Sequence, residues 1–237
     1  MKLTYTRILV KISGEQLAGS SGTGFDSIVA KKVANEIAQV VATGTEVVVI
    51  VGGGNYMRGA LGAGNGLGRV TADFMGMLGG VMNATAAADV FNANSVPAYA
   101  LSPIKVDQIL DYYTQRRALH HLRKGRVVVI GGGVGRPYFT HDMAAVGLGL
   151  ELDCDVVIKT TKVDGVYTKD PVKFTDAKKF DTLTFDEALA NPDVKVMDKA
   201  ALGQAMENNL KVVVCDLETP GNIKRLVLGE AVGTLIA

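Results

Sequence analysis

The sequence predicts an α/β fold, a three-layer α/β/α sandwich in which helices cover both faces of a mostly parallel sheet. One observation is the apolar run Val47–Val51, where β-branched residues follow one another without alternation. Such runs are typical of strands buried on both faces of a parallel sheet. The second observation is order. These runs alternate along the chain with segments of helical apolar spacing, which indicates βαβ units.

Composition allows a large core and excludes some classes of partner. At 237 residues the chain is long enough for one large α/β domain or two small ones, and 48% of it is apolar. A net charge of +1 gives no general electrostatic attraction to nucleic acid or to an anionic membrane, so we expect neither partner. Cys154 and Cys215 lie inside apolar runs and are expected to be buried free thiols. The histidines show no metal-ligand spacing, so we predict no protein metal site.

Two further features bear on the compartment. The N-terminal residues contain no apolar segment of signal-peptide length. The longest uncharged stretch, 74–88, is shorter than the about 20 residues that a membrane helix needs. We therefore expect a soluble cytoplasmic protein.

The first half of the chain contains three predicted strands, at 7–12, 47–51 and 96–101. A Gly/Ser/Thr-rich loop at 19–24 precedes a helix that Asp26 caps and Gly44 ends. A second flexible stretch, 61–68, leads into a long helix predicted at 69–93. The segment 107–124 is also expected to be helical, with a solvated amphipathic face.

The second half continues the alternation. Strands are expected at 127–130, 155–159, 211–215 and 234–236, with turns at 160–171 and a loop at 172–181. Helices are expected to start at 143 and to cover 183–189 and 199–209. A last helix would have Thr219 as its N-cap and Pro220 at its first helical position.

Two glycine-rich turns follow predicted strands and carry the first functional signal. Gly52–Gly54 leads to Arg58, and Gly131–Gly135 leads to Arg136. Glycines let backbone N–H groups approach an anion closely, and an arginine fork suits phosphate. A single such turn is equally well explained as a tight strand-to-helix connection. The repetition favours a site where two phosphate-bearing ligands face each other.

Two lysines, Lys11 and Lys159, lie at the ends of predicted strands. Ligands of parallel sheets bind beyond the carboxyl ends of the strands, so we expect the lysines and both glycine turns to converge. The alternative is a lysine on an edge strand, lying along the surface. Neither G-x-x-x-x-G-K-[ST] nor G-x-G-x-x-G occurs. Convergent positive charge suits phosphoryl transfer, which needs positioning and charge stabilisation more than covalent help.

Three stretches resemble the amino acid kinase superfamily: Lys11–Gly14, Gly52–Asn55 and Val163–Pro171. Over nearly its full length the chain is similar to the bacterial uridylate kinases, through Arg58-Gly59, Asp73, the segments 75–78 and 81–83, the mouth 133–142 and Lys195–Asp198. The resemblance implies one amino acid kinase-like domain over 1–237. It also implies transfer of the ATP γ-phosphoryl group to UMP in pyrimidine nucleotide (UTP/CTP) biosynthesis, with Mg²⁺ carried by ATP, in a homohexamer.

The resemblance also assigns roles to residues. ATP phosphates would be held by Lys11, Ile12, Ser13 and Gly14, with Gly54 and Arg58 beside them. The adenosine pocket would be lined by Thr161, Tyr167 and Asp170. UMP would be held by Gly53, Asp73, Val134, Gly135, Arg136, Pro137, Tyr138, Phe139, Thr140 and His141. Lys11 and Lys159 would bracket the moving phosphoryl group, and Asp142 would orient a lysine.

The chain departs from the family pattern at three mouth positions. The family usually has threonine where this chain has Val134 and His141, and asparagine where it has Arg136. Two alternatives stay open at this point: an amino acid or carbamate kinase of the same superfamily, and a non-catalytic nucleotide-binding regulator. Intact Lys11 and Lys159 favour catalysis, because binding alone does not need charge converging on a bridging oxygen.

A further difference concerns regulation. Family members activated by GTP carry basic residues on the long helix and the following strand, at a subunit interface. The matching positions here are Ala88, Asn92 and Tyr99, which leaves Arg126 as the basic residue. Because a triphosphate needs charge-assisted partners to offset its desolvation, we expect weak or absent GTP activation.

Overall fold

The computed structural model describes residues 3–58, 66–192, 194 and 197–237. Gly59, most of the stretch 61–68, and Lys195 and Val196 of the motif 195–198 lie outside the described residues.

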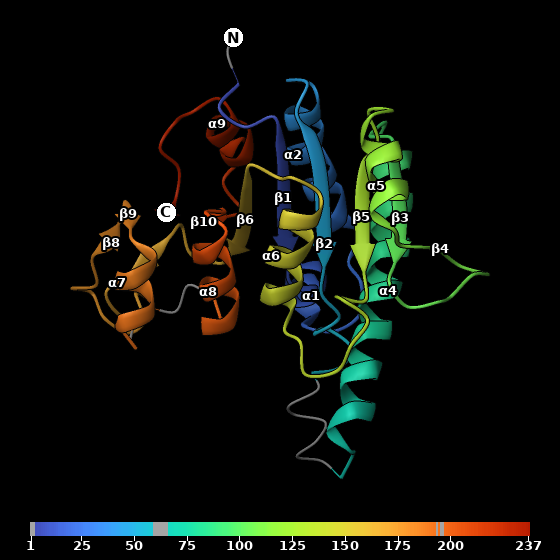
Figure 1. Ribbon diagram of the computed structural model, residues 1–237, viewed down its shortest axis with the longest axis horizontal. Coiled ribbons are helices and arrows are strands. Elements are labelled where there is room, and N and C mark those ends of the chain that lie inside the picture. Colours follow the sequence, from blue (N-terminus) through green and yellow to red (C-terminus); the bar gives the residue numbers. More distant parts are fainter. Residues whose placement is uncertain (1–2, 59–65, 193, 195–196) are drawn as a thin grey trace.

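The described residues form one nine-stranded sheet and a separate two-stranded one (Figure 1). The strand order in the large sheet is β4-β3-β5-β2-β1-β6-β10-β11-β9. All its neighbouring pairs are parallel except β10 with β11, which is antiparallel. The strands are β1 Arg7–Ile12, β2 Glu46–Val51, β3 Ala98–Ser102, β4 Asp111–Tyr112, β5 Val127–Gly131, β6 Val156–Thr161, β9 Thr182–Leu183, β10 Lys211–Asp216 and β11 Thr234–Ile236.

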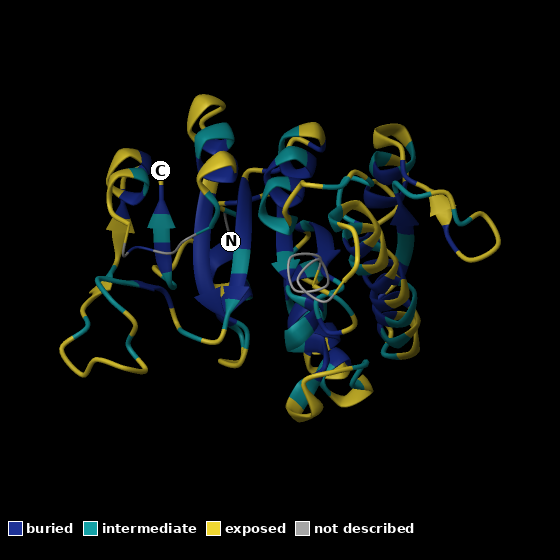
Figure 2. Cartoon of the chain, turned by 90° about the horizontal axis from the view of Figure 1, so that it is seen from below, coloured by how far each residue is buried: buried dark blue, intermediate teal, exposed yellow. Residues whose placement is uncertain are grey.

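Helices cover both faces of the sheet, which confirms the predicted three-layer sandwich. One apolar cluster takes Val47, Val49 and Val51 from β2, and the other takes Val48 and Ile50, as the alternation of side chains requires. Exposed residues therefore gather on the outer sides of the helices and in the loops (Figure 2). The first face carries α1 Gly14–Leu17, α2 Ser27–Val41, α4 Arg69–Ala93 and α9 Asn222–Val227. The second carries α5 Gln115–Leu122, α6 His141–Glu151, α7 Phe185–Ala190 and α8 Lys199–Glu207.

Several local predictions are confirmed. The bounds of α4 match those expected, and Asp26 caps α2 by accepting bonds from the backbone N–H groups of Ile28 and Val29. Both cysteines are free and buried, and they lie on opposite faces of the sheet. Burial raises the pKa of each thiol, Cys154 and Cys215, to about 12.

The prediction of a helix over 107–124 is wrong in its first part. The helix α5 begins only at Gln115, where the Thr114 hydroxyl accepts a bond from the backbone N–H of Arg117. The residues before it pair instead with β3, since Tyr113 N–H donates to the Ser102 carbonyl (2.8 Å) and β4 runs beside β3. This sheet contact comes from a distant part of the chain, and it overrides the local helical pattern.

Other bounds differ from the prediction as well: α6 begins at 141 rather than 143, and α7 covers 185–190 rather than 183–189. β6 continues two residues past Lys159, to Thr161. The segments predicted as turns and loop contain the small antiparallel pair of β7 Val166–Tyr167 with β8 Lys179–Phe180. The last helix, α9, begins at Asn222 rather than Pro220, because the Glu36 carboxylate accepts the backbone N–H of Gly221 (2.9 and 2.8 Å) and fixes a later start.

The helix α4 is long and apolar enough to span a membrane by length and composition alone. One of its faces, however, belongs to the core, with Val81, Ala84 and Phe91 buried against the sheet. A core helix accounts for this composition without a membrane. Its N-terminal half projects beyond the carboxyl ends of the strands (Figure 1).

Glycines bring α4 into backbone contact with the carboxyl ends of β2 and β5. A Cβ atom on Gly53 would lie 2.0 Å from the Gly76 carbonyl oxygen, and one on Gly131 would lie 2.3 Å from the Gly80 carbonyl oxygen. No real Cβ is accommodated at such distances. The glycines of the two turns therefore serve packing as well as any ligand.

We expect Gly131→Ala to lower the free energy of unfolding by about 1–3 kcal/mol, the usual cost of overpacking a core contact. Gly203 is the matched control, since it lies inside α8 with open space around it. Gly203→Ala should raise the free energy of unfolding by up to about 1 kcal/mol. Urea titrations of both variants measure this. Equal shifts for the two would contradict a packing role for Gly131.

Candidate active site

The carboxyl ends of four adjacent strands, β5, β2, β1 and β6, form the base of the site. Lys11 of β1 pairs in register with Lys159 of β6, so the two lysines stand side by side. Each lies two residues after an apolar side chain, Leu9 or Val157, of the face that α6 covers. The glycine turns follow β2 and β5 at the same edge. The predicted convergence of lysines and glycine turns is present.

Asp142 lies between the two lysines. Its Oδ1 is 3.3 Å from Lys11 Nζ, and its Oδ2 is 2.8 Å from Lys159 Nζ. The Thr140 hydroxyl caps α6 by accepting the backbone N–H of Met143 (3.0 Å), which places Asp142 in the first helical turn. A carboxylate there is favoured by the helix dipole. We expected Asp142 to orient one lysine, and its carboxylate instead contacts both.

The three side chains are only 12%, 14% and 17% exposed for Lys11, Asp142 and Lys159, so little water screens their charges. Burial, reinforced by the charge of Lys159, lowers the pKa of Lys11, although Asp142 opposes the shift. Burial alone would raise the pKa of Asp142, but the two lysines outweigh it and hold that pKa below its usual value. With two cations and one anion, the cluster has an excess positive charge that an additional anion would neutralise.

His141 lies against the same cluster. Its ring lies close to Gly52, where a Cβ atom would come within 3.3 Å of His141 Nδ1 and 3.2 Å of the backbone nitrogen of Gly14. Its Nε2 is buried and has no hydrogen-bond partner among the described residues. Burial, with a smaller effect of the nearby Lys11 charge, lowers the pKa of His141 to about 4. The imidazole is therefore neutral at pH 7.

The turn after β1 begins the short helix α1. Ser13 caps it, accepting a bond from Gln16 N–H (3.3 Å), while Gln16 Oε1 accepts from Ser13 N–H (3.0 Å). Gln16 Oε1 also accepts a bond from the Thr160 hydroxyl of β6 (3.0 Å). The Ser13 hydroxyl is thus already used in capping, and the turn is tied to the neighbouring strand.

A cavity of about 410 Å³ lies between the N-terminal half of α4 and the two glycine turns. His141 lines it, whereas Lys11 and Lys159 do not. Nine of the predicted nucleotide-binding residues line it: Gly53, Gly54, Arg58, Asp73, Val134, Arg136, Phe139, Thr140 and His141. Gly135, Pro137 and Tyr138 belong to the same mouth without lining the cavity. Gly132 and Gly133, from the predicted glycine turn 131–135, line it as well. Sequence reasoning gave no binding role to the other lining residues: Val51, Met57, Arg69, Gly76, Met77 and Gly80.

Asp73 connects the cavity wall to the mouth. Its carboxylate accepts bonds from Arg69 Nε (2.9 and 3.0 Å) and from the backbone N–H of Tyr138 (2.9 Å). Tyr138 has φ 68°, an uncommon value for a residue with a side chain, and its ring lies 5.0 Å from the Arg69 guanidinium carbon. The basic first residue of α4, four before Asp73, is a sequence signal that would have identified Arg69.

Other predicted residues are engaged or more peripheral. Arg58 forms an ion pair with Glu15 at the start of α1. Thr161 ends β6 and donates to the Val163 carbonyl (2.6 Å), while Tyr167 OH donates to Asp164 (2.5 Å). Asp170 is exposed and accepts the backbone N–H of Val172 (3.0 Å). Thr161 ends β6 and the other two follow it in the chain, and none of the three lines the cavity.

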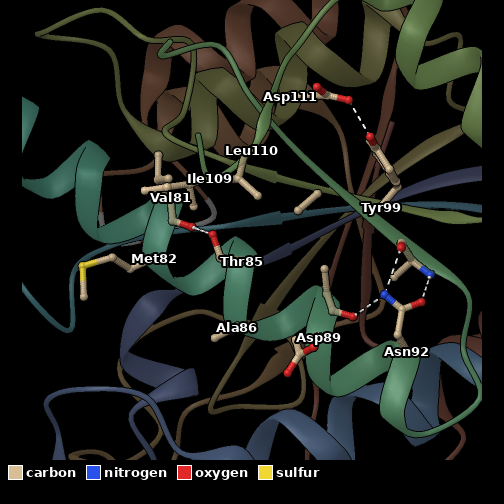
Figure 3. A pocket seen from close by; sticks show the side chains of 13 residues that line it. Val81, Met82, Thr85, Ala86, Asp89, Asn92, Tyr99, Ile109, Leu110 and Asp111 are labelled. Atoms are coloured by element: carbon tan, nitrogen blue, oxygen red, sulfur yellow. Dashed lines mark hydrogen bonds between the residues drawn. The ribbon is translucent and has the colours of Figure 1, made fainter. Parts of the chain in front are cut away.

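A second cavity, of about 680 Å³, lies between α4, β3 and the segment before α5 (Figure 3). Ala88, Asn92 and Tyr99 line it, together with the carboxylates of Asp89 and Asp111. Tyr99 OH donates to Asp111, and the Tyr99 ring stacks on His121 at 3.7 Å. Among the described residues that line this cavity there is no lysine or arginine, and Arg117 and Arg126, the cations nearest to Tyr99, lie outside the lining.

The arrangement at the lysines is that of a phosphoryl-transfer site, where glycine turns and fixed positive charge surround the reacting group. The comparisons with known proteins agree with this class. A family model described as the amino acid kinase family matches residues 6–216, and the chain belongs to that family.

Solved structures extend the comparison. A UMP kinase from Bacillus anthracis is 37% identical, with 98% of this chain and 96% of that chain covered and a TM-score of 0.93. A UMP kinase from Ureaplasma parvum is 29% identical over the whole of both chains, with a TM-score of 0.90. A uridylate kinase from Archaeoglobus fulgidus is 28% identical over 97% and 99% of the two chains, with a TM-score of 0.73.

The lowered pKa of His141 predicts a stability change in acid. An unfolded histidine titrates at about 6.5. Between that pH and the folded value of about 4, the unfolded chain binds a proton that the folded chain does not. The free energy of unfolding therefore falls as pH drops through this window, by about 3 kcal/mol from this group.

We expect His141→Thr to remove most of that loss when urea unfolding is compared at pH 6.5 and pH 4. His120→Gln is the control, since the His120 side chain is exposed and contacts the ring of His121, away from the lysines. If both variants lose as much stability in acid as the parent chain, His141 is not the group responsible.

Proposed function

We propose that this chain is a UMP kinase, which transfers the γ-phosphoryl group of ATP to UMP and so supplies UDP for pyrimidine nucleotide synthesis. The observation that carries the proposal is the pair Lys11 and Lys159, which Asp142 holds at the same sheet edge as the two glycine turns. The near full-length similarity to UMP kinases supports the choice of acceptor. We expect the reaction to take place in the cytoplasm, where both nucleotides are soluble.

In the proposed reaction a phosphate oxygen of UMP attacks the γ-phosphorus of ATP. The bond to the β,γ-bridging oxygen breaks, and ADP leaves with that electron pair. Lys11 and Lys159 would stabilise the negative charge on the moving group from two sides. Asp142 keeps both ammonium groups in place, since it reaches one lysine with each of its oxygens. This is positioning with fixed charge, the main requirement of phosphoryl transfer.

We place ATP at the turn after β1 and UMP in the cavity beside α4. ATP would approach Lys11, Ile12, Ser13 and Gly14 with its phosphates, near Gly54 and Arg58, and its adenosine would extend toward Thr161, Tyr167 and Asp170. UMP would occupy the cavity of about 410 Å³, with its phosphate toward the lysines. Val134 offers no hydroxyl there, whereas Arg136 adds a charge at the cavity wall. That charge favours the phosphate end of the acceptor.

Magnesium would come with ATP. It would supply positive charge that neutralises part of the negative charge of the ATP phosphates. Two carboxylates near the ATP turn are already paired, Asp142 with the lysines and Glu15 with Arg58. We therefore expect the ion to be held mainly by phosphate oxygens and water, a common arrangement for Mg²⁺.

The acceptor decides between this proposal and its alternatives. An amino acid or carbamate kinase would phosphorylate a carboxylate or carbamate, and a regulator would bind nucleotide without turnover. A coupled assay of ADP formation with UMP, CMP and glutamate as competing acceptors separates the three. UMP should be preferred. Turnover with glutamate alone, or none with any acceptor, would overturn the proposal.

We also propose that the protein assembles as a homohexamer in which α4 supplies one of the subunit contacts, a two-fold one. Val70, Phe74, Leu78 and Met82 recur every four residues along this helix and are 41–53% exposed. This spacing forms one apolar ridge on the helix surface, suited to packing against the same ridge of a second copy.

Replacing either lysine tests the mechanism. Lys11→Met and Lys159→Met should each lower kcat by roughly 10²-fold or more, the scale of losing one preorganised charge donor. The KM for UMP should change less, because the charge acts mainly on the transition state. Lys162→Met, an exposed lysine just past β6, is the control. A variant with near-normal turnover would remove that lysine from the mechanism.

Asp73→Asn tests recognition of the ribose. The amide keeps the shape but loses charge toward ribose hydroxyls, so the affinity for UMP should fall by about tenfold or more. Discrimination against 2′-deoxy-UMP should narrow, which the ratio of kcat/KM for the two acceptors measures. An unchanged ratio would mean that Asp73 only anchors Arg69 and the backbone of Tyr138.

The second cavity predicts weak regulation by GTP. Because Asp89 and Asp111 line it without a cationic side chain, a triphosphate should bind poorly there. We expect UMP-dependent rates to stay within about twofold across a GTP titration, and light scattering to give a hexamer mass with and without GTP. A several-fold, saturable rise in rate with GTP would contradict weak regulation. A mass smaller than that of six chains would contradict the hexamer.

A further inference from the structure

Two buried asparagines form a reciprocal pair beneath the glycine turns. Asn55 follows β2 and is 4% exposed, and Asn83 lies in the middle of α4 and is fully buried. Asn55 Nδ2 donates to Asn83 Oδ1 (3.1 Å), and Asn83 Nδ2 donates to Asn55 Oδ1 (2.8 Å). The remaining N–H groups donate to the backbone, from Asn55 to the Gly24 carbonyl (2.5 Å) and from Asn83 to the Gly52 carbonyl (2.6 Å).

The pair joins four segments of the chain. Besides α4 and the turn after β2, it holds the 22–24 loop through the bond of the Asn55 amide to the Gly24 carbonyl. The Thr23 hydroxyl adds a bond to the backbone carbonyl of Asn55 (3.0 Å). The fourth segment is the start of α1. A Cβ atom on Gly14 would lie 2.3 Å from Asn55 Oδ1, so the backbone of Gly14 rests directly on this amide. The asparagines thus contact both the turn after β1, at Gly14, and the turn after β2, at Gly52–Gly54.

The hydrogen bonds of the pair leave little freedom. Each amide has two N–H donors, and all four are used. Hydrogen bonds are directional, and buried ones are costly to break, so the amide planes fix the positions of the backbone groups that they contact. An apolar side chain at either position would fill space without specifying direction. Phosphoryl transfer is sensitive to such placement, since a shift of 1 Å can cost about 10²-fold in rate.

We propose that Asn55 and Asn83 are positioning residues for phosphoryl transfer, which set the distance between the turn at Gly14 and the turn at Gly52–Gly54. The inference rests on the proposed kinase function. The pair does not contact the lysines, and its action on the reaction is through the backbone of the two turns. Loss of the pair should therefore affect kcat more than the binding of either nucleotide alone.

The test compares Asn83→Leu, Asn55→Leu and the double variant with a matched control. Asn92→Leu lies on the same helix and also removes amide bonds, to the Ala88 carbonyl (2.9 Å) and with Ala98 at the start of β3 (2.9 and 3.1 Å). Steady-state rates give kcat and both KM values, and urea unfolding gives stability. Asn83→Ser, which is smaller and supplies one hydroxyl in place of the amide, replaces the leucine variant if that one does not fold.

We expect Asn83→Leu and Asn55→Leu to lower kcat by about tenfold or more, with KM values within about threefold of the parent. The double variant should lose little more than either single variant, because the two amides act as one unit. Asn92→Leu should lose stability and keep kcat within about twofold.

A purely structural pair would give a different result. Asn83 and Asn92 variants would then lose stability alike and keep kcat, or lose activity only through raised KM values, and either outcome overturns the positioning role. Failure of the kinase proposal shows separately, as absence of turnover in the parent chain.

Discussion

The site depends on the close approach of α4 to the carboxyl ends of β2 and β5. Gly53 and Gly131 on the sheet side leave no room for a Cβ atom against the backbone of Gly76 and Gly80. Because the helix is this close, Asp73 reaches the backbone of Tyr138, and Asn83 reaches the Gly52 carbonyl. One backbone contact thus sets the cavity wall, the anchoring of the mouth and the buried amide pair. A helix displaced by one methyl group would loosen all three.

The electrostatics of the site follow from the register of two strands. Lys11 and Lys159 are paired across β1 and β6, and both are largely buried. Two like charges at this spacing are tolerable in a folded protein only with a counterion, and Asp142 enters from the capped start of α6 to supply it. Asp142 balances one of the two positive charges, and the remaining one is a charge that an incoming phosphate would neutralise.

Much of the fold could be predicted from local pattern. The bounds of α4, the buried strands and the Asp26 cap all follow from side chains within a few residues. The errors lie where a distant segment decides. The segment from 107, predicted as helical, instead pairs with β3. The start of α9 is set by Glu36, which lies 185 residues before Gly221.

The same division holds for the site. The lysines and both glycine turns were predictable, because strand ends of a parallel sheet meet at one edge. The bridging of both lysines by Asp142 depends on the register of β1 with β6, which no local pattern contains. The Asn55–Asn83 pair was not predictable for a similar reason: two amides 28 residues apart meet only because glycines admit the helix.

The two buried cysteines can report when the helical layers of this protein separate from the sheet. The Cys154 side chain is buried in the apolar cluster under α6 and α8, and that of Cys215, a residue of β10, in the cluster under α2 and α9, so the two thiols face opposite sides of the sheet. With their pKa values raised to about 12, neither thiol is nucleophilic in the folded state at neutral pH. Alkylation therefore requires exposure, and its rate at each cysteine reports how often that layer separates from the sheet. A single chain can thus show whether its two helical layers open together or one at a time.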